Sequence, residues 1–286
     1  MNVSYYYQTF VGLDKMMSHP EDVTHIIVSS IHFGKDKDGE KNIYLNDNLP
    51  NDKIFDKLWK ETEEISKKGV KIMCMMGGAG GAYKELFSDY STYFPLLVNM
   101  IRSKPWIHGI DIDIEEIVNI SDVKMLINSI TAEFGDDFII TMAPVSGSLI
   151  SDNHGMGGFS YKELYNSEEG KYINWFNCQC YYSYNYDTFK KIVDNGYPAN
   201  KIIMGMESGQ FSDLSFIENI LASFKIYSSP LISIILELFG MSKYTKIIAS
   251  FQAGPCMTSP FGHEIIDLPS NIKSSFPPIW LHIRYG

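Results

Sequence analysis

The stretch from Ile107 to Glu115, IHGIDIDIE, decides how the rest of this sequence is interpreted. Asp111, Asp113 and Glu115 alternate with isoleucines, and the side chains of a β-strand have a period of two residues. The three carboxylates therefore share one face of a strand, and the isoleucines share the other. Apolar stretches flank this segment on both sides, which argues against a solvated edge strand.

Similar apolar runs recur along the chain and alternate with stretches of helical periodicity. Strands that are buried on both faces have this continuous apolar character. The predicted strands before residue 211 lie at 5–11, 23–33, 70–76, 107–115, 138–143, 175–182 and 201–206. Helical faces are predicted at 55–65, 96–101, 123–130, 161–165 and 188–193. Strands that alternate with helices at this spacing are joined by crossovers into a parallel sheet.

The predicted fold class is α/β, and the predicted architecture is a (β/α)8 TIM barrel with an atypical C-terminal portion after about residue 211. Seven strands, each leading into a loop at its C-terminal end, favour a barrel over an open doubly wound sheet, which is the alternative. The rhythm degrades after Gln210. Leu214 to Phe224 is a candidate helix, and the eighth strand is either Lys246 to Phe251 or Ile279 to Ile283.

Length and charge narrow the organisation and the partners. The chain has 286 residues, and an α/β barrel forms one domain of this size. We therefore expect a single domain over residues 1–286, and a monomer. The net charge of −10 argues against a nucleic-acid partner, because binding phosphates requires clustered Lys and Arg.

We expect no membrane partner, no metal and no cofactor. The longest apolar run, Leu231 to Phe239, is too short to span a bilayer and contains Glu237. Four cysteines do not make a disulfide framework, and Cys178 and Cys180 lack the partner pair of a zinc site. The N-terminus has neither a basic region nor an apolar core typical of a signal peptide. We expect a cytoplasmic protein, and non-classical secretion stays open.

The acidic strand is the strongest chemical signal. In a barrel, the isoleucines face the outer helices, so the carboxylates point inward, with Glu115 nearest the C-terminal mouth, where barrel active sites lie. Neighbouring carboxylates raise one another's proton affinity, which suits a general acid. An exposed acidic edge strand and a divalent-metal site are the alternatives. No phosphate-binding loop of the form G-x-x-x-x-G-K-[ST] accompanies the metal alternative.

The run from Gly109 to Glu115 resembles the D-G-x-D-x-D-x-E signature of family-18 glycoside hydrolases, the chitinases and endo-β-N-acetylglucosaminidases. It falls on the fourth predicted strand, where that family carries it. The segment Val70 to Gly78, VKIMCMMGG, resembles the third-strand S-x-G-G region, with Met75 at the usual Ser. The segment Gln179 to Tyr182, QCYY, resembles the sixth-strand M-x-Y-D motif, which has Gln in several relatives. The resemblance covers roughly residues 4–211.

This resemblance implies a role for each matching residue. Glu115 would protonate the glycosidic oxygen and later activate water. Asp113 would hold and polarise the N-acetyl group of the substrate, and Asp111 would pair with Asp113. Tyr181 would donate a hydrogen bond to the acetamido carbonyl, beside Gln179. The predicted substrate-binding set is completed by Asn177, Gly77, Gly78, Met142 and Asn185.

Strand parity gives an independent prediction for the sixth strand: Asn177, Gln179 and Tyr181 share the inward face, and the two cysteines face the helices. The resemblance also implies the mechanism, in which the acetamido oxygen of the substrate, and not a protein nucleophile, attacks C1 with retention. The predicted activity is hydrolysis of β-1,4 linkages next to N-acetylglucosamine in chitin, chitooligosaccharides or an N-glycan core. The alternative is an inactive chitinase-like carbohydrate-binding protein.

The sequence departs from the family pattern at three places. His108 stands at the first Asp of the signature, where a structural role is expected. Tyr182 replaces the Asp or Asn that follows the sixth-strand Tyr. Nothing after Gln210 clearly resembles the eighth-strand element with its Trp, for which Trp280 is the candidate.

Overall fold

The computed structural model describes residues 2–152, 154–207 and 279–282. All the strands in these ranges belong to one sheet. They are β1 (Val3–Tyr7), β2 (His25–Lys35), β3 (Lys41–Leu45), β4 (Lys71–Gly77), β5 (Ile107–Asp113), β6 (Ile139–Met142), β7 (Ile173–Gln179), β8 (Ile202–Glu207) and β9 (Ile279–His282).

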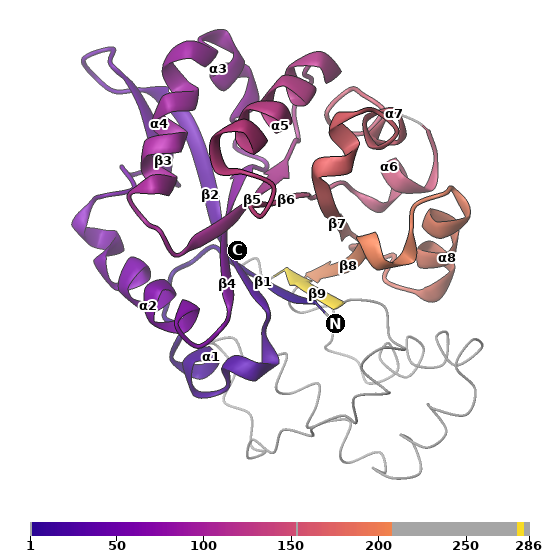
Figure 1. Cartoon of the computed structure of the whole chain (residues 1–286), viewed down its shortest axis with the longest axis horizontal. Helices are drawn as coiled ribbons and strands as arrows, with labels where there is room; N and C mark the ends of the chain where they lie inside the picture. Colours follow the sequence, from indigo (N-terminus) through magenta and orange to yellow (C-terminus); the bar gives the residue numbers. More distant parts are fainter. Residues whose placement is uncertain (1, 153, 208–278, 283–286) are drawn as a thin grey trace.

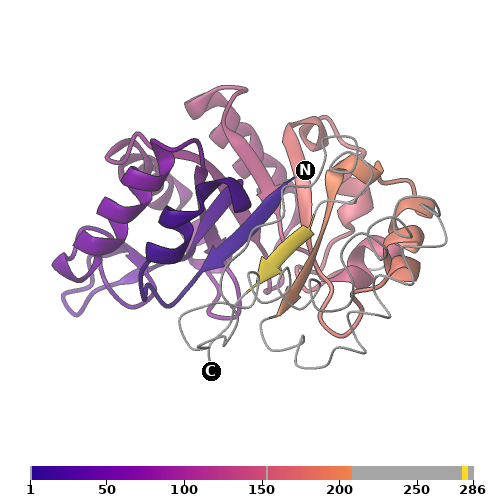
Figure 2. The same cartoon turned by 90° about the horizontal axis from the view of Figure 1, so that it is seen from below.

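The sheet closes on itself through β1, which pairs in parallel with both β2 and β9. Eight of the described strands are parallel and form the ring, and Figures 1 and 2 show β9 between β8 and β1. The predicted TIM barrel is thus confirmed, and Ile279–His282 supplies its eighth strand. The other candidate strand, 246–251, and the candidate helix at 214–224 lie outside the described residues.

Strand β3 was not predicted. It pairs antiparallel with β2, and the two strands form a hairpin beside the ring. Its turn carries four charged residues, and the Asp36 side chain accepts hydrogen bonds from the backbone N–H groups of Asp38 and Glu40. A polar run of this kind is read as a loop, and β3 itself offers few apolar positions.

The helices lie outside the ring of strands (Figure 1). They are α1 (Asp14–Ser18), α2 (Asp56–Ser66), α3 (Tyr83–Ser88), α4 (Tyr90–Arg102), α5 (Ile120–Phe134), α6 (Ser146–Ile150), α7 (Tyr161–Tyr165) and α8 (Tyr186–Asp194), with short 3-10 turns η1 (Pro20–Asp22), η2 (Lys53–Phe55), η3 (Glu169–Tyr172) and η4 (Ala199–Lys201). The five predicted helical faces fall on α2, α4, α5, α7 and α8. No helix in these ranges is long and apolar enough to cross a membrane.

The closed ring divides the buried side chains into an outer and an inner core. Ile110 and Ile112 of β5 and Cys178 of β7 belong to the outer core, between strands and helices, as strand parity predicts. The inner core, inside the ring, consists of Tyr6, Ile27, Met73, Met75, Trp175 and Ile203. The polar face of β5 is therefore enclosed by the ring, with apolar side chains around it.

A buried histidine lies at the N-terminal end of β2. The His25 ring packs edge-on against Trp175, with 4.9 Å between ring centroids, and is 7% exposed. Burial, with smaller contributions from the positive charges of Lys71 and His108, lowers the pKa of His25 to about 4. The folded barrel thus holds this imidazole neutral at pH values where the unfolded chain protonates it.

The protein should lose stability in mild acid through His25. Because the folded pKa is about 4 and the ordinary value is 6.5, the unfolded chain binds the extra proton as pH falls from 6.5 to 4. The loss approaches roughly 3 kcal/mol at the acid end. The free energy of unfolding, measured with denaturant at pH 7.5, 6 and 5, should fall less steeply for His25→Gln than for the wild type. The partly exposed His19 supplies the control, His19→Gln. A decline as steep in His25→Gln as in the wild type would contradict this account.

Candidate active site

Asp111 lies in the middle of β5 and is completely buried. Its Oδ1 accepts hydrogen bonds from Thr141 Oγ1 at 2.5 Å and from Asn177 Nδ2 at 3.0 Å, and its Oδ2 accepts one from Tyr6 Oη. Burial raises the pKa of Asp111, and these three hydrogen bonds oppose the increase. The donors come from β6, β7 and β1, so three other strands of the ring hold this carboxylate.

Asp113 lies two residues nearer the C-terminal mouth and is 2% exposed. Gln179 Nε2 donates to its Oδ1 at 3.0 Å and to the carbonyl oxygen of Ala143 at 2.7 Å. These two contacts fix the orientation of the Gln179 amide, and with it one oxygen of Asp113. Tyr181 packs against the inner core, on the same side as Asn177 and Gln179, which confirms the predicted parity of the sixth barrel strand.

The two glycines at the end of β4 lie against Asp113. Gly77 has φ of +96°, and a Cβ there would lie 2.2 Å from the carbonyl oxygen of Asp113 and 2.5 Å from the Tyr83 ring. Gly78 has φ of +82°, and its N–H donates to the same carbonyl oxygen at 2.9 Å. Only glycine permits this backbone conformation and this close approach. The glycines position the chain beside the carboxylate.

Glu115 follows the last residue of β5 by two positions, so it lies at the C-terminal end of the ring, and its side chain is half-buried. Its negative charge acts on Tyr161 of α7. Burial raises the pKa of Tyr161 well above its ordinary value, and the charges of Asp113, Asp111 and Glu115 add to the increase. The phenol therefore stays neutral beside the line of carboxylates.

The remaining predicted residues are placed differently. Met142 is completely buried in the outer core, because it follows the inward-facing Thr141 on β6, so the structure does not bring it to the mouth. The Asn185 side chain caps α8 by accepting from the Thr188 N–H at 2.9 Å. Tyr182 is 87% exposed, with φ of +59°.

The first departure from the signature, His108, has a structural contact. Its Nδ1 accepts a hydrogen bond from the Ile72 N–H at 3.2 Å, where the pairing of β4 with β5 shifts register. The extra residue at this bulge is His108 itself. Trp280 occupies the register position opposite Ser4 of β1 and Gly205 of β8.

Three residues that hold the site were missed from the sequence: Tyr6, Thr141 and Glu116. Tyr6 and Thr141 face inward on their strands, but nothing local indicates that they meet Asp111. Glu116 Oε1 accepts hydrogen bonds from the backbone N–H groups of Ala82 and Tyr83, both at 2.6 Å. The sequence did offer a signal for Glu116, because this carboxylate directly follows the last residue of the signature.

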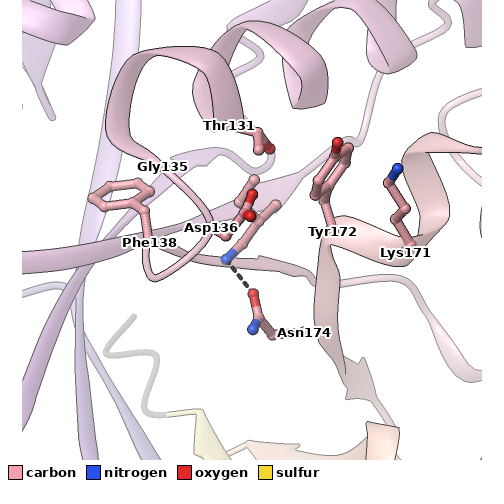
Figure 3. A pocket seen from close by; sticks show the side chains of 8 residues that line it. Thr131, Gly135, Asp136, Phe138, Lys171, Tyr172 and Asn174 are labelled. Carbon is pink, nitrogen blue, oxygen red and sulfur yellow. Dashed lines mark hydrogen bonds between the residues drawn. The ribbon is translucent and has the colours of Figure 1, made fainter.

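A separate cavity of about 360 Å³ lies at the other end of the ring, where β6 and β7 begin (Figure 3). Its lining residues are Thr131, Gly135, Asp136, Phe138, Ile140, Lys171, Tyr172 and Asn174. The Ile140 N–H donates to Asn174 Oδ1 at 2.8 Å across it. No carboxylate of β5 takes part in this cavity. Within the described ranges, no group of three or more His, Cys, Asp or Glu side chains is arranged to hold a metal ion.

Solved structures similar to this chain are glycosidases. A fungal endo-β-N-acetylglucosaminidase is 28% identical, with a TM-score of 0.69, over 79% of this chain and 86% of its own. The chitinase ChiC from Aspergillus fumigatus is 25% identical, with a TM-score of 0.70, over 98% and 90%. A chitinase from Pseudoalteromonas aurantia, at 19% identity and a TM-score of 0.57 over 77% and 87%, shares the fold. A comparison with curated protein sequences gave no match.

The protein is thus a glycosidase built on a TIM barrel. It belongs to glycosyl hydrolases family 18, whose family model matches residues 2–212. The matched region contains the whole of β5 and every described residue of the site.

Gly77→Ala should destabilise the protein strongly. The new Cβ meets the Asp113 carbonyl oxygen in a left-handed backbone, so we expect a loss of about 2–5 kcal/mol in the free energy of unfolding. Gly39→Ala is the matched control: its φ is +85°, but no atom lies within 4 Å of the added Cβ, so only about 1–2 kcal/mol of strain is expected. Equal losses for both variants in urea unfolding would show that the contact with Asp113 is unimportant.

Tyr6→Phe should lower both stability and turnover. It leaves Asp111 Oδ2 without its phenol donor in a fully buried position, which costs about 1.5–3 kcal/mol. Tyr7→Phe is the neighbouring control, because Tyr7 Oη lies on the other face of β1 and accepts the Gly12 N–H. Both variants should melt at lower temperature, but only Tyr6→Phe should reduce kcat on a chromogenic glycoside. Normal kcat in Tyr6→Phe would rule out a role for this hydrogen bond in catalysis.

Proposed function

We propose that this protein is a retaining glycoside hydrolase that cleaves β-1,4 linkages next to N-acetylglucosamine by substrate-assisted catalysis. The observation that carries the proposal is a series of three carboxylates: Asp111 and Asp113 are buried on β5, and Glu115 follows two residues beyond its C-terminal end. The substrate class is supported by two of the similar structures described above, a chitinase and an endo-β-N-acetylglucosaminidase.

Glu115 acts first as the general acid. Its carboxyl proton passes to the glycosidic oxygen as the bond from that oxygen to C1 breaks, and the leaving sugar departs as an alcohol. The acetamido oxygen of the same substrate attacks C1 and forms a cyclic oxazolinium ion. Glu115, now a carboxylate, then removes a proton from water, whose oxygen adds to C1 and reopens the ring. Two inversions at C1 give net retention.

Asp113 stabilises the intermediate. The acetamido N–H becomes more acidic and the ring positive as the oxazolinium forms, so a carboxylate beside it binds the transition state more tightly than the ground state. Gln179 holds Oδ1 of Asp113 through the 3.0 Å hydrogen bond and so orients the carboxylate that would receive the acetamido N–H. Tyr181, two residues beyond the end of β7, would donate a hydrogen bond to the acetamido carbonyl oxygen.

Asp111 supports this step without touching the substrate. Its two oxygens are occupied by Tyr6, Thr141 and Asn177, so its place is below the pocket and its contribution is electrostatic. A second carboxylate in the enclosed ring favours positive charge at the sugar above it, because the effective dielectric constant is low there.

Two substrate sources fit this chemistry. Chitooligosaccharides and the chitobiose core of an N-glycan share the N-acetylglucosamine unit on which the mechanism depends. Gln179 in the sixth-strand motif slightly favours an N-glycan substrate over chitin. Product analysis on chitooligosaccharides beside a high-mannose glycopeptide distinguishes the two.

Glu115→Gln should abolish most of the activity while the protein stays folded. The amide cannot give a proton to the leaving group, so kcat should fall by about 10²–10⁴-fold on chitotetraose. Glu64→Gln, at an exposed position of α2, is the control and should keep wild-type kcat. Unchanged hydrolysis by Glu115→Gln would overturn the proposal. Saturable binding of chitotetraose by the wild type without any product would favour the alternative, a carbohydrate-binding protein.

A further inference from the structure

The second glutamate of the acidic segment, Glu116, has no part in the chemistry above. Its side chain is half-buried and turns away to the loop after β4, residues 78–82. There a single oxygen, Oε1, accepts the N–H groups of Ala82 and Tyr83 at 2.6 Å each. These N–H groups begin α3 and have no partner within the helix, so the carboxylate caps it.

The same loop is attached to β5 at a second point. The Gly78 N–H donates to the Asp113 carbonyl oxygen at 2.9 Å, and Gly81 N–H closes the loop on the carbonyl oxygen of Gly78 at 2.9 Å. The two attachments, one at Asp113 and one at Glu116, bracket Glu115 on both sides. A third contact holds the loop from β2, because His32 Nδ1 donates to the Gly81 carbonyl oxygen at 2.6 Å.

The two attachments lie where β5 has ended and the sheet no longer fixes the backbone. Strand β5 ends at Asp113, and its last pairing with β4 joins Asp113 to Gly77. Glu115 therefore leaves the ladder of backbone hydrogen bonds, although general acid catalysis requires its carboxyl group within hydrogen-bond reach of the glycosidic oxygen. The Glu116 contacts replace the missing ladder at the next residue.

We propose that Glu116 is a positioning residue, which fixes the backbone of the catalytic acid by tying residues 114–116 to the β4–α3 loop. The inference rests on the proposed role of Glu115. The positioning role depends on the place of Glu116 Oε1 and not on its charge. The amide oxygen of Gln, at the same distance along the side chain, can therefore replace it, and the shorter carboxylate of Asp cannot.

The test uses two substrates with the same chitobiosyl group and different leaving groups. A sugar leaving group, as in chitotetraose, needs protonation, and 2,4-dinitrophenolate leaves without it. The ratio of kcat/KM for the two substrates therefore reports how well the acid is positioned, and a general loss of structure does not change this ratio. The measurement is made on the full chain, with thermal melting as the record of folding.

Glu116→Ala and Glu116→Asp should lower kcat/KM for chitotetraose by about 10–100-fold, and for the dinitrophenyl chitobioside by less than about threefold. Glu116→Gln should stay within about threefold of the wild type on both substrates, because its Oε1 still accepts both N–H groups. Glu61→Ala is the matched control, since Glu61 also accepts a loop N–H, that of Leu13 at 3.1 Å, away from the site. It should lower the melting temperature and leave the ratio unchanged.

A ratio in Glu116→Ala equal to that of the wild type would overturn the inference. If Glu116→Ala does not fold, the ratio in Glu116→Asp decides in the same way. Glu115→Gln distinguishes the two proposals. If the ratio of kcat/KM changes in Glu115→Gln but in neither Glu116→Ala nor Glu116→Asp, only the positioning role of Glu116 is wrong. An unchanged ratio in Glu115→Gln removes the proposed function itself.

Discussion

A carboxylate with no exposed surface, Asp111, sets the constraint on which the rest of the structure depends. An unpaired buried charge of this kind is costly, and it persists only if donors surround it. The donors are Tyr6, Thr141 and Asn177, and the sequence separation between Tyr6 and Asp111 is 105 residues. The polar network therefore forms only when β1, β5, β6 and β7 have all joined the sheet. Assembly of the sheet and construction of this part of the site are therefore coupled.

The period of two along β5 correctly predicted which side chains of this strand face the inside of the ring. It assigned Asp111 and Asp113 to the inner face and the isoleucines to the outer core. The same period along β7 assigned Cys178 to the outer core, and the structure confirms each assignment. Parity also explains why Met142, which was predicted as a substrate-binding residue, lies in the outer core: Thr141 faces inward, so its neighbour faces the helices. The donors to Asp111 were not predictable, because their meeting depends on the register of strands across the ring, and no local pattern encodes that register.

Strand ends were harder to predict than strands. The apolar alternation of β5 continues to Glu115, but pairing stops at Asp113, because Gly77 and Gly78 of the neighbouring strand turn across its carbonyl oxygen. A similar early end occurs on β7, where Cys180 and Tyr181 leave the strand. These ends are where side chains gain freedom to reach a substrate, and where glycines and caps must take over from the sheet. Functional positions thus lie at strand ends, where the periodicity of the sequence is least informative.

In the proposed mechanism, the acetamido oxygen of the substrate acts as the nucleophile, beside Asp113 and Glu115. The most direct measurement compares kcat/KM for two nitrophenyl N-acylglucosaminide substrates that differ only in the acyl group, acetyl or trifluoroacetyl. Fluorine withdraws electrons from the attacking oxygen, so the account predicts a fall of at least about tenfold, or 1.4 kcal/mol in the activation barrier. Equal values for the two substrates would contradict it, because a nucleophile or a water molecule supplied by the protein would not respond to the acyl group.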